Sequence, residues 1–183
     1  MTRRRAVVGA AALLVATGVV LGFALRGGSG HPVTSGRVVP GTRAPEFSAL
    51  DADRGHAVLV SFLDTQAQAT AANDPSRAQI PFLKSMNTQN RSYGLRTVIV
   101  DTARADRNTL VNFTYDWALG RTIAVVPDPG GTLTRRYGVT APPTTFLVDR
   151  RGVVRRRWNG FATAVQLDFA VRPLVGRPLA GSG

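Results

Sequence analysis

The sequence predicts an α/β domain in which helices cover both faces of a central mixed sheet. Short apolar runs of strand length alternate with segments of helical periodicity, and a hairpin follows towards the C-terminal end. Strands separated by helices pair in parallel, whereas a hairpin adds antiparallel strands at one side. With 44% of its 183 residues hydrophobic, the chain is long enough for one domain of about 140 residues and extra segments.

The first half of the domain is predicted to be a strand, a helix and a second strand. AVLVSFL at 57–63 and LRTVIVD at 95–101 are continuous apolar runs, which is typical of strands buried on both faces. The segment 75–94 between them predicts a helix, which Pro81 should kink and Gly94 should end.

The second half continues this alternation and ends in a hairpin and a helix. Apolar residues at helical spacing predict a helix at 106–119, and Gly120 should end it. The remaining elements are a strand at 123–128, a short helix at 132–137, a hairpin formed by 144–149 and 153–158, and a closing helix at 164–175.

An apolar segment precedes the domain. Arg3, Arg4 and Arg5 come before an uncharged run at 6–25 that can span about 30 Å of hydrocarbon as a helix. A cleaved signal peptide is the alternative, but its apolar core usually has about 7 to 15 residues and ends at a small-x-small site. The arginines predict a cytoplasmic N-terminus and a single-pass protein of the cell membrane, with its C-terminal domain extracytoplasmic.

The chain is therefore predicted to have five parts. They are a cytoplasmic basic segment at 1–5, a transmembrane anchor or signal at 6–25, a flexible linker at 26–42, the α/β domain at 43–177 and a tail at 178–183.

The net charge of +12 does not predict nucleic-acid binding, because the arginines are scattered and the domain is expected outside the cytoplasm. The densest group is Arg155, Arg156 and Arg157, with Arg150 and Arg151 nearby. Such charges discourage an edge hairpin from pairing with other chains. They could also contact anionic lipid or an acidic partner.

Few residues suit a metal site or a catalytic hydroxyl. His31 and His56 are the only histidines, and the sequence has no cysteine, so we predict neither a metal nor a cofactor. Ser76 with His56 as its base would need a fixed distance, and no G-x-S-x-G turn provides one. No catalytic residue is assigned.

Several motifs resemble one family. They are GTRAPEFSAL at 41–50, VLVSFL at 58–63 and VVPDPGGTLTRRYGVTAPPTTFLVDRRGVVRRRWNG at 125–160. These segments resemble the thioredoxin-like redoxins, especially the membrane-tethered thiol-disulfide oxidoreductases of the TlpA and ResA type and the AhpC/TSA group. The resemblance covers about residues 40 to 177 and implies a thioredoxin-like fold. It also implies dithiol exchange, which this chain cannot perform alone because the nucleophile is a thiolate.

The resemblance allows two alignments of the family's Cys-x-x-Cys motif. RAQIP at 77–81 matches the family pattern after that motif and puts Asn73, Asp74, Pro75 and Ser76 in its place. An ungapped reading from the strand puts Ala67 and Thr70 at the two cysteine positions instead. We expect Asn73 or Asp74 to cap the following helix, with Pro75 at its first position. A small anion at the same amides is the alternative.

Pro143 matches the family's cis-proline, which implies that it faces the active site. In the family, the preceding residue pairs with an extended peptide through its backbone. That residue is Pro142 here, and proline has no N–H to donate.

Asp64, Thr65 and Gln66 follow the first strand at the edge where α/β domains usually bind ligands. We therefore expect a binding face formed by these residues, 73–76 and Pro142–Pro143. The leading hypothesis is a non-catalytic binding or assembly module with an unknown extracytoplasmic protein partner. The alternative is a redox or peroxidase-type enzyme that works with a partner's thiols.

Overall fold

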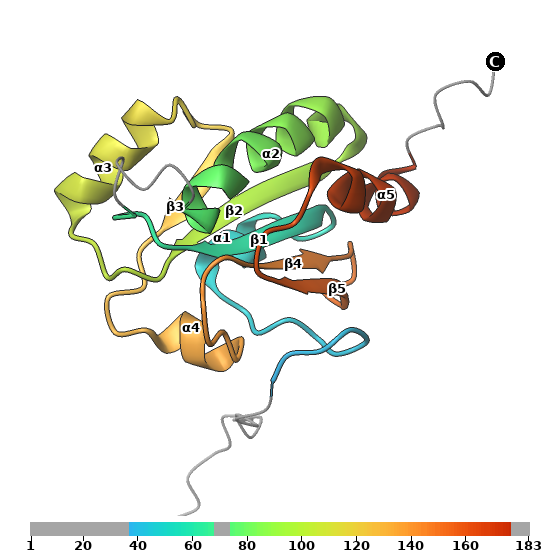
Figure 1. Cartoon of the computed structure of the whole chain (residues 1–183). Coiled ribbons are helices and arrows are strands. Elements are labelled where there is room, and N and C mark those ends of the chain that lie inside the picture. Colours follow the sequence, from blue (N-terminus) through green and yellow to red (C-terminus); the bar gives the residue numbers. More distant parts are fainter. Residues whose placement is uncertain (1–36, 68–73, 177–183) are drawn as a thin grey trace, which may run out of the picture. The chain divides into compact units, whose positions relative to one another are not determined.

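A five-stranded mixed sheet forms the centre of the domain (Figure 1). The structure, a computed structural model, describes residues 37–67 and 74–176. The strands are β1 (Ala57–Leu63), β2 (Leu95–Asp101), β3 (Ile123–Val126), β4 (Thr144–Val148) and β5 (Val154–Asn159), in the order β3-β2-β1-β4-β5. Both β1 and β3 pair in parallel with β2, whereas β4 is antiparallel to β1 and β5. The predicted mixed α/β sheet is confirmed.

Helices cover both faces of this sheet (Figure 1). On one face, α2 (Pro75–Asn90), α3 (Arg107–Asp116) and α5 (Ala164–Val175) pack their apolar residues with those of the strands. On the other face lie α1 (Ser48–Ala52) and α4 (Thr132–Arg136). The short 3-10 helix Arg91–Tyr93 extends α2.

Most predicted elements lie within two residues of their expected bounds, but one predicted helix is shorter and one short helix was not predicted. The predicted helix over 106–119 ends earlier, at Asp116, because Ala118 has a left-handed φ of 47°. The five-residue helix α1 was not predicted, because it is too short to show helical periodicity. α2 continues through Pro81, which lies on the exposed side of the helix, and Gly94 with φ 91° follows its 3-10 extension.

Each face of the sheet has its own apolar core. The core under α2 and α5 includes Leu59, Leu83 and Leu167, which are fully buried. The opposite core is centred on Tyr137, whose ring lies 5.0 Å from that of Phe62, centroid to centroid. The Tyr137 hydroxyl donates to the carbonyl of Pro45 at 2.8 Å, and burial raises the pKa of this phenol. Close packing on both faces explains why β1 is buried along its whole length.

The segment before α1 is held against the hairpin. The N–H of Gly41 donates to the carbonyl of Val154 at 2.7 Å, and the N–H of Ala44 donates to that of Gly152 at 2.9 Å. Val38 is buried, so packing begins within the range predicted as linker.

The predicted anchor at 6–25, the tail at 178–183, Thr70 and Asn73 lie outside the described residues. Within 37–67 and 74–176, no helix has the length and apolar character needed to cross a membrane.

Candidate functional site

Three segments that the sequence singled out meet at one edge of the sheet. The antiparallel register of β1 and β4 pairs Phe62 with Thr144, so the residues after β1 lie beside those before β4. The N–H of Asp64 donates to the Ser76 hydroxyl at 3.1 Å, which joins the end of β1 to the start of α2. The N–H of Gly160 donates to the carbonyl of Pro143 at 2.8 Å and adds the segment between β5 and α5.

The start of α2 is capped by its own carboxylate. Asp74 is the N-cap, and its Oδ1 accepts the N–H groups of Ser76 at 2.8 Å and Arg77 at 3.1 Å. Pro75 occupies the first turn, where its missing N–H leaves no donor unpaired. The amides that could hold a small anion are thus bonded to Asp74.

Ser76 has a structural role at this helix start. It is only 2% exposed, its hydroxyl accepts from Asp64, and its N–H donates to Asp74. Ala67 instead lies in the loop after β1, where its carbonyl accepts from the Arg77 guanidinium at 3.3 Å. Because α2 begins at Pro75, Ser76 lies in the first helical turn and Ala67 does not.

The three polar residues after β1 differ in accessibility. Thr65 is buried, and its hydroxyl donates to Asp101 at 2.8 Å. Asp64 is half-buried and accepts the N–H of Gln66 at 2.9 Å, whereas the Gln66 side chain is exposed. Among these three side chains, Gln66 is the one most accessible to a partner.

Asp101 organises the loops at this edge and was not assigned to the site from the sequence. It is fully buried at the end of β2 and accepts the N–H groups of Ala103 at 2.9 Å and Ala105 at 2.7 Å, besides the Thr65 hydroxyl. The sequence signal that could have identified its role is a carboxylate at the last position of a strand predicted to be buried.

A buried glutamine joins α2 to the segment before α5. Gln79 donates from Nε2 to the carbonyl of Ala162 at 3.1 Å and accepts the N–H of Ala162 at 2.7 Å. The neighbouring Phe161 is 40% exposed, and its ring meets that of Phe82 edge-on at 5.1 Å. These residues were not predicted, because the pairing joins positions 83 residues apart in the chain.

The Pro142–Pro143 peptide bond is cis. Pro143 is buried, while Pro142 is exposed at the same edge. With no N–H at Pro142, the exposed residue presents only its carbonyl for backbone pairing.

The arginines of the hairpin have different surroundings. Arg155 forms an ion pair with Asp149 at 2.7 Å. Arg157 donates to the carbonyls of Val38 at 3.0 Å and Gly138 at 2.8 Å, and its pKa is lowered by burial and by the charge of Arg37. Of residues 155–157, Arg156 alone has no side-chain hydrogen bond or ion pair within the described residues.

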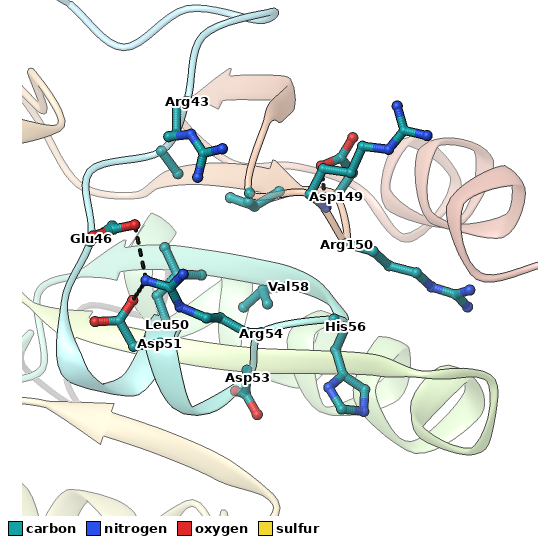
Figure 2. A pocket seen from close by; sticks show the side chains of 15 residues that line it. Arg43, Glu46, Leu50, Asp51, Asp53, Arg54, His56, Val58, Asp149 and Arg150 are labelled. Atoms are coloured by element: carbon teal, nitrogen blue, oxygen red, sulfur yellow. Dashed lines mark hydrogen bonds and ion pairs between the residues drawn. The ribbon is translucent and has the colours of Figure 1, made fainter.

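A small charged pocket of about 150 Å³ lies at the opposite edge, where β1 begins and β4 ends (Figure 2). Figure 2 shows Arg54 directed at Glu46 and Asp51, each 3.0 Å away. Asp53 and Asp149, which also line the pocket, pair with arginines too. The carboxylates are therefore neutralised by arginines, which gives the pocket no evident preference for a cation.

No group of three or more His, Cys, Asp or Glu side chains within 37–67 and 74–176 is arranged to hold a metal ion.

Comparisons with known proteins find relatives that are named as thiol-disulfide oxidoreductases. No family model matches the chain. The thiol-disulfide oxidoreductase ResA of Bacillus thuringiensis subsp. konkukian is 26% identical over 165 residues, covering 85% of this chain and 88% of the relative. The thiol:disulfide interchange protein DsbE of Xylella fastidiosa is 42% identical over 53 residues, which is 29% of this chain and 27% of the relative.

Solved structures of similar fold are also found. A protein proposed to be the thiol:disulfide interchange protein DsbE of Chlorobium tepidum has a TM-score of 0.64 and 26% identity, with coverage of 76% of this chain and 99% of that one. StoA of Bacillus subtilis has a TM-score of 0.52 and 21% identity, covering 64% of this chain and 84% of that one. The domain thus has a thioredoxin-like fold. The chain is similar to thioredoxin-like redoxins named ResA and DsbE, and it contains no cysteine.

Proposed function

We propose that this chain is a non-catalytic binding module on a thioredoxin-like fold. The observation that carries the proposal is the helix start at 74–77, where Ser76 and Asp74 bond to the surrounding backbone. Dithiol exchange needs a thiolate nucleophile, and none of the 183 residues is cysteine. The Ser76 hydroxyl does not replace it, because it is buried and accepts the N–H of Asp64.

The proposed binding face lies at the edge where β1 ends and β4 begins. Gln66, Pro142 and Phe161 are its exposed side chains, and they come from three different segments of the chain. Buried hydrogen bonds fix two of these segments: Asp101 bonds to the segment after β1, and Gln79 bonds to the segment before α5. A face with one aromatic ring, one proline and one amide suits a protein partner, because it combines apolar area with few polar contacts.

The partner is proposed to be an extracytoplasmic protein and the module to be anchored in the membrane. Two sequence features support this proposal: the apolar run at 6–25 is long enough to span a membrane, and three arginines precede it. By the positive-inside rule, such a single-pass protein has its domain outside the cytoplasm. A protease added to intact spheroplasts should then digest the domain, whereas a cytoplasmic domain would stay intact until the cells are lysed.

Crosslinking in cells tests the binding face. A photoreactive amino acid replaces Gln66 or Phe161, and the matched control replaces Thr88, which is exposed on α2 away from the site. Ser76 is unsuitable as a probe position, because it is buried. We expect crosslinked protein from positions 66 and 161 and less from 88. Equal yields from all three positions would contradict the proposed face.

Assays of insulin reduction and peroxide consumption test the non-catalytic role. The purified chain should show no turnover above a heat-denatured sample. Turnover above that control would favour the alternative of an enzyme with non-thiol groups, and turnover only with an added thiol partner would favour the alternative of shared thiols.

Contact between the hairpin and anionic lipid is a second proposal, based on the arginine cluster at 155–157. Arg156 is the arginine available for it, since Arg155 and Arg157 bond within the domain. The R156S variant should then bind vesicles of phosphatidylglycerol more weakly than the unmodified chain. Unchanged binding would remove the proposal.

A further inference from the structure

An apolar groove lies along α3 at the edge of the sheet that β3 forms, and none of the exposed residues of the proposed binding face lines it. Its volume is about 1050 Å³, which is the size of a site for a small organic molecule. Because α3 has 10 residues, a ligand that lies along the helix can contact about 15 Å of it. The main apolar lining residues are Leu110, Val111, Tyr115, Val125 and Pro127.

Two arginines meet at one end of this groove, where the loop after β2 lies beside the loop after β3 (Figure 1). A Cβ atom placed on Gly131 would lie 3.3 Å from Nη1 of Arg135 and 3.6 Å from Nη2 of Arg104. Both guanidinium groups therefore border the space that this glycine leaves open, and one oxyanion there can accept from both. Arg104 directly precedes Ala105, and Gly131 follows Pro129 by two residues. Since Ala105 and Pro129 line the groove, the arginine pair lies at its end.

The positive charge at this end has no carboxylate partner. Within the described part of the chain, neither Arg104 nor Arg135 forms an ion pair, and the same is true of Arg107, which also lines the groove. Arg135 donates to the carbonyl of Gly130 at 2.7 Å, which fixes its guanidinium without neutralising it. Arg104 has a left-handed φ of 58°, which is unfavourable for a residue with a Cβ atom. This end of the groove thus has the charge that an anionic group requires.

The polar side chains on the walls are bonded within α3. Asp106 lines the groove, and its carboxylate accepts the N–H of Thr109 at 2.8 Å as the cap of the helix. Thr114 also lines the groove, and its hydroxyl donates to the carbonyl of Leu110 at 2.8 Å. A hydrocarbon chain along these walls therefore leaves neither side chain without its hydrogen bond, and it removes apolar surface from water.

We propose that this groove binds a long-chain fatty acid. Its carboxylate lies between Arg104 and Arg135, with one oxygen for each guanidinium, and its acyl chain lies along α3. The charge is at one end and the apolar wall follows it, which is the arrangement of charge and hydrocarbon in a fatty acid. A bilayer phospholipid has two chains, whereas the groove follows a single helix. The proposal does not depend on the proposed binding function.

Photolabelling of the full chain in phosphatidylcholine vesicles tests the site. The probe is a diazirine analogue of dodecanoic acid, and trypsin then releases most of α3 as the peptide 108–121, because arginines lie at 107 and 121. The control is the tryptic peptide that begins at Trp158, since it contains Val165 and Phe169 of α5, which are 78% and 77% exposed. We expect several-fold more label on 108–121 than on the control peptide. Equal labelling of the two peptides would overturn the proposal.

Competition tests the charge of the ligand. An excess of unlabelled dodecanoate should remove most of the label from 108–121, whereas the same concentration of dodecyltrimethylammonium should remove little. The two amphiphiles have the same chain length and opposite charge, so the difference reports the contact with the arginines. Equal displacement by both would overturn the proposal.

R104G tests the contact with the carboxylate. Glycine adopts a φ of 58° without strain, so R104G removes the guanidinium and preserves the loop. The matched control is R156S, since Arg156 is exposed on β5 and its loss changes the net charge equally. R104G should lower the labelling of 108–121 about fivefold, whereas R156S should change it by less than about twofold. Equal effects of the two variants would overturn the proposal.

V111E tests the contact with the acyl chain. Val111 lines the groove and is 59% exposed, so a glutamate there adds a charge to the wall without entering the core. The matched control is V165E on α5. V111E should lower the labelling of 108–121 several-fold, and V165E should leave it unchanged. Unchanged labelling in V111E would overturn the proposal.

Discussion

Loss of the Gln79 side-chain amide should destabilise the domain more than any exposed substitution. Gln79 and Ala162 are fully buried, and two hydrogen bonds of 3.1 Å and 2.7 Å join them. The Q79L variant keeps an apolar side chain of similar size but leaves the N–H and C=O of Ala162 without partners. Each unsatisfied buried group costs about 1 to 3 kcal/mol, so the free energy of unfolding should fall by about 3 kcal/mol.

Urea denaturation followed by circular dichroism measures this effect. With a slope of about 2 kcal/mol per molar urea, the midpoint of Q79L should fall by about 1.5 M. Q66L is the matched control, because the exposed Gln66 side chain has no hydrogen bond within the described residues, and its change should stay within about 0.5 kcal/mol. A loss below about 1 kcal/mol for Q79L would refute the reasoning, since it would mean that water replaces the amide.

Three further substitutions test the helix start and the hairpin. D74A removes the acceptor of two N–H groups and should cost about 1 kcal/mol in urea denaturation, whereas D74S should retain most of the stability. S76C replaces a hydroxyl acceptor with a weakly accepting thiol. Because position 76 is buried, this thiol should react far more slowly with Ellman's reagent in the folded state than the thiol of the exposed control T88C. Equal rates would contradict the burial of position 76. Burial alone would raise the pKa of Asp149, but the N–H of Val153, the Arg155 guanidinium and the N–H of Arg151 lower it overall. A lowered pKa stabilises the folded state fully above the unfolded value of about 3.9, and this stabilisation is lost as the pH falls through the folded value. Between pH 5 and pH 2 the unmodified chain should therefore lose more stability than D149N, and parallel pH profiles would contradict this.

The sequence predicted those elements whose signals are local. β1 and β2 have the predicted bounds, because their residues are apolar on both faces. The closing helix also has the predicted bounds: Thr163 and Gln166 form a capping box at its start, and Gly176 follows its end with φ 70°. The early end of α3 could not be predicted, since the left-handed conformation of Ala118 contradicts the usual preference of alanine.

The site was predicted in outline, and its supporting contacts were not. The residues after β1 and before β4 could be placed at one edge, because parallel and antiparallel pairing fix the direction of each strand. The accessibility of Thr65 and Ser76 could not be predicted, because it depends on Asp101 and Asp64, which come from other segments.

The residues at the start of α2 depend on one another, so a thiol introduced there would not by itself provide dithiol exchange. In a dithiol enzyme, free amides at a helix N-terminus lower the pKa of the nearby thiol. Here the Asp74 carboxylate accepts two of these N–H groups and adds a negative charge, which opposes a second anion at the same place. Removing Asp74 would free the amides but would also remove the cap that holds α2. A cysteine at position 76 would in turn weaken the acceptor for Asp64. Dithiol exchange at this helix start would thus require several simultaneous substitutions, which supports the proposed non-catalytic role.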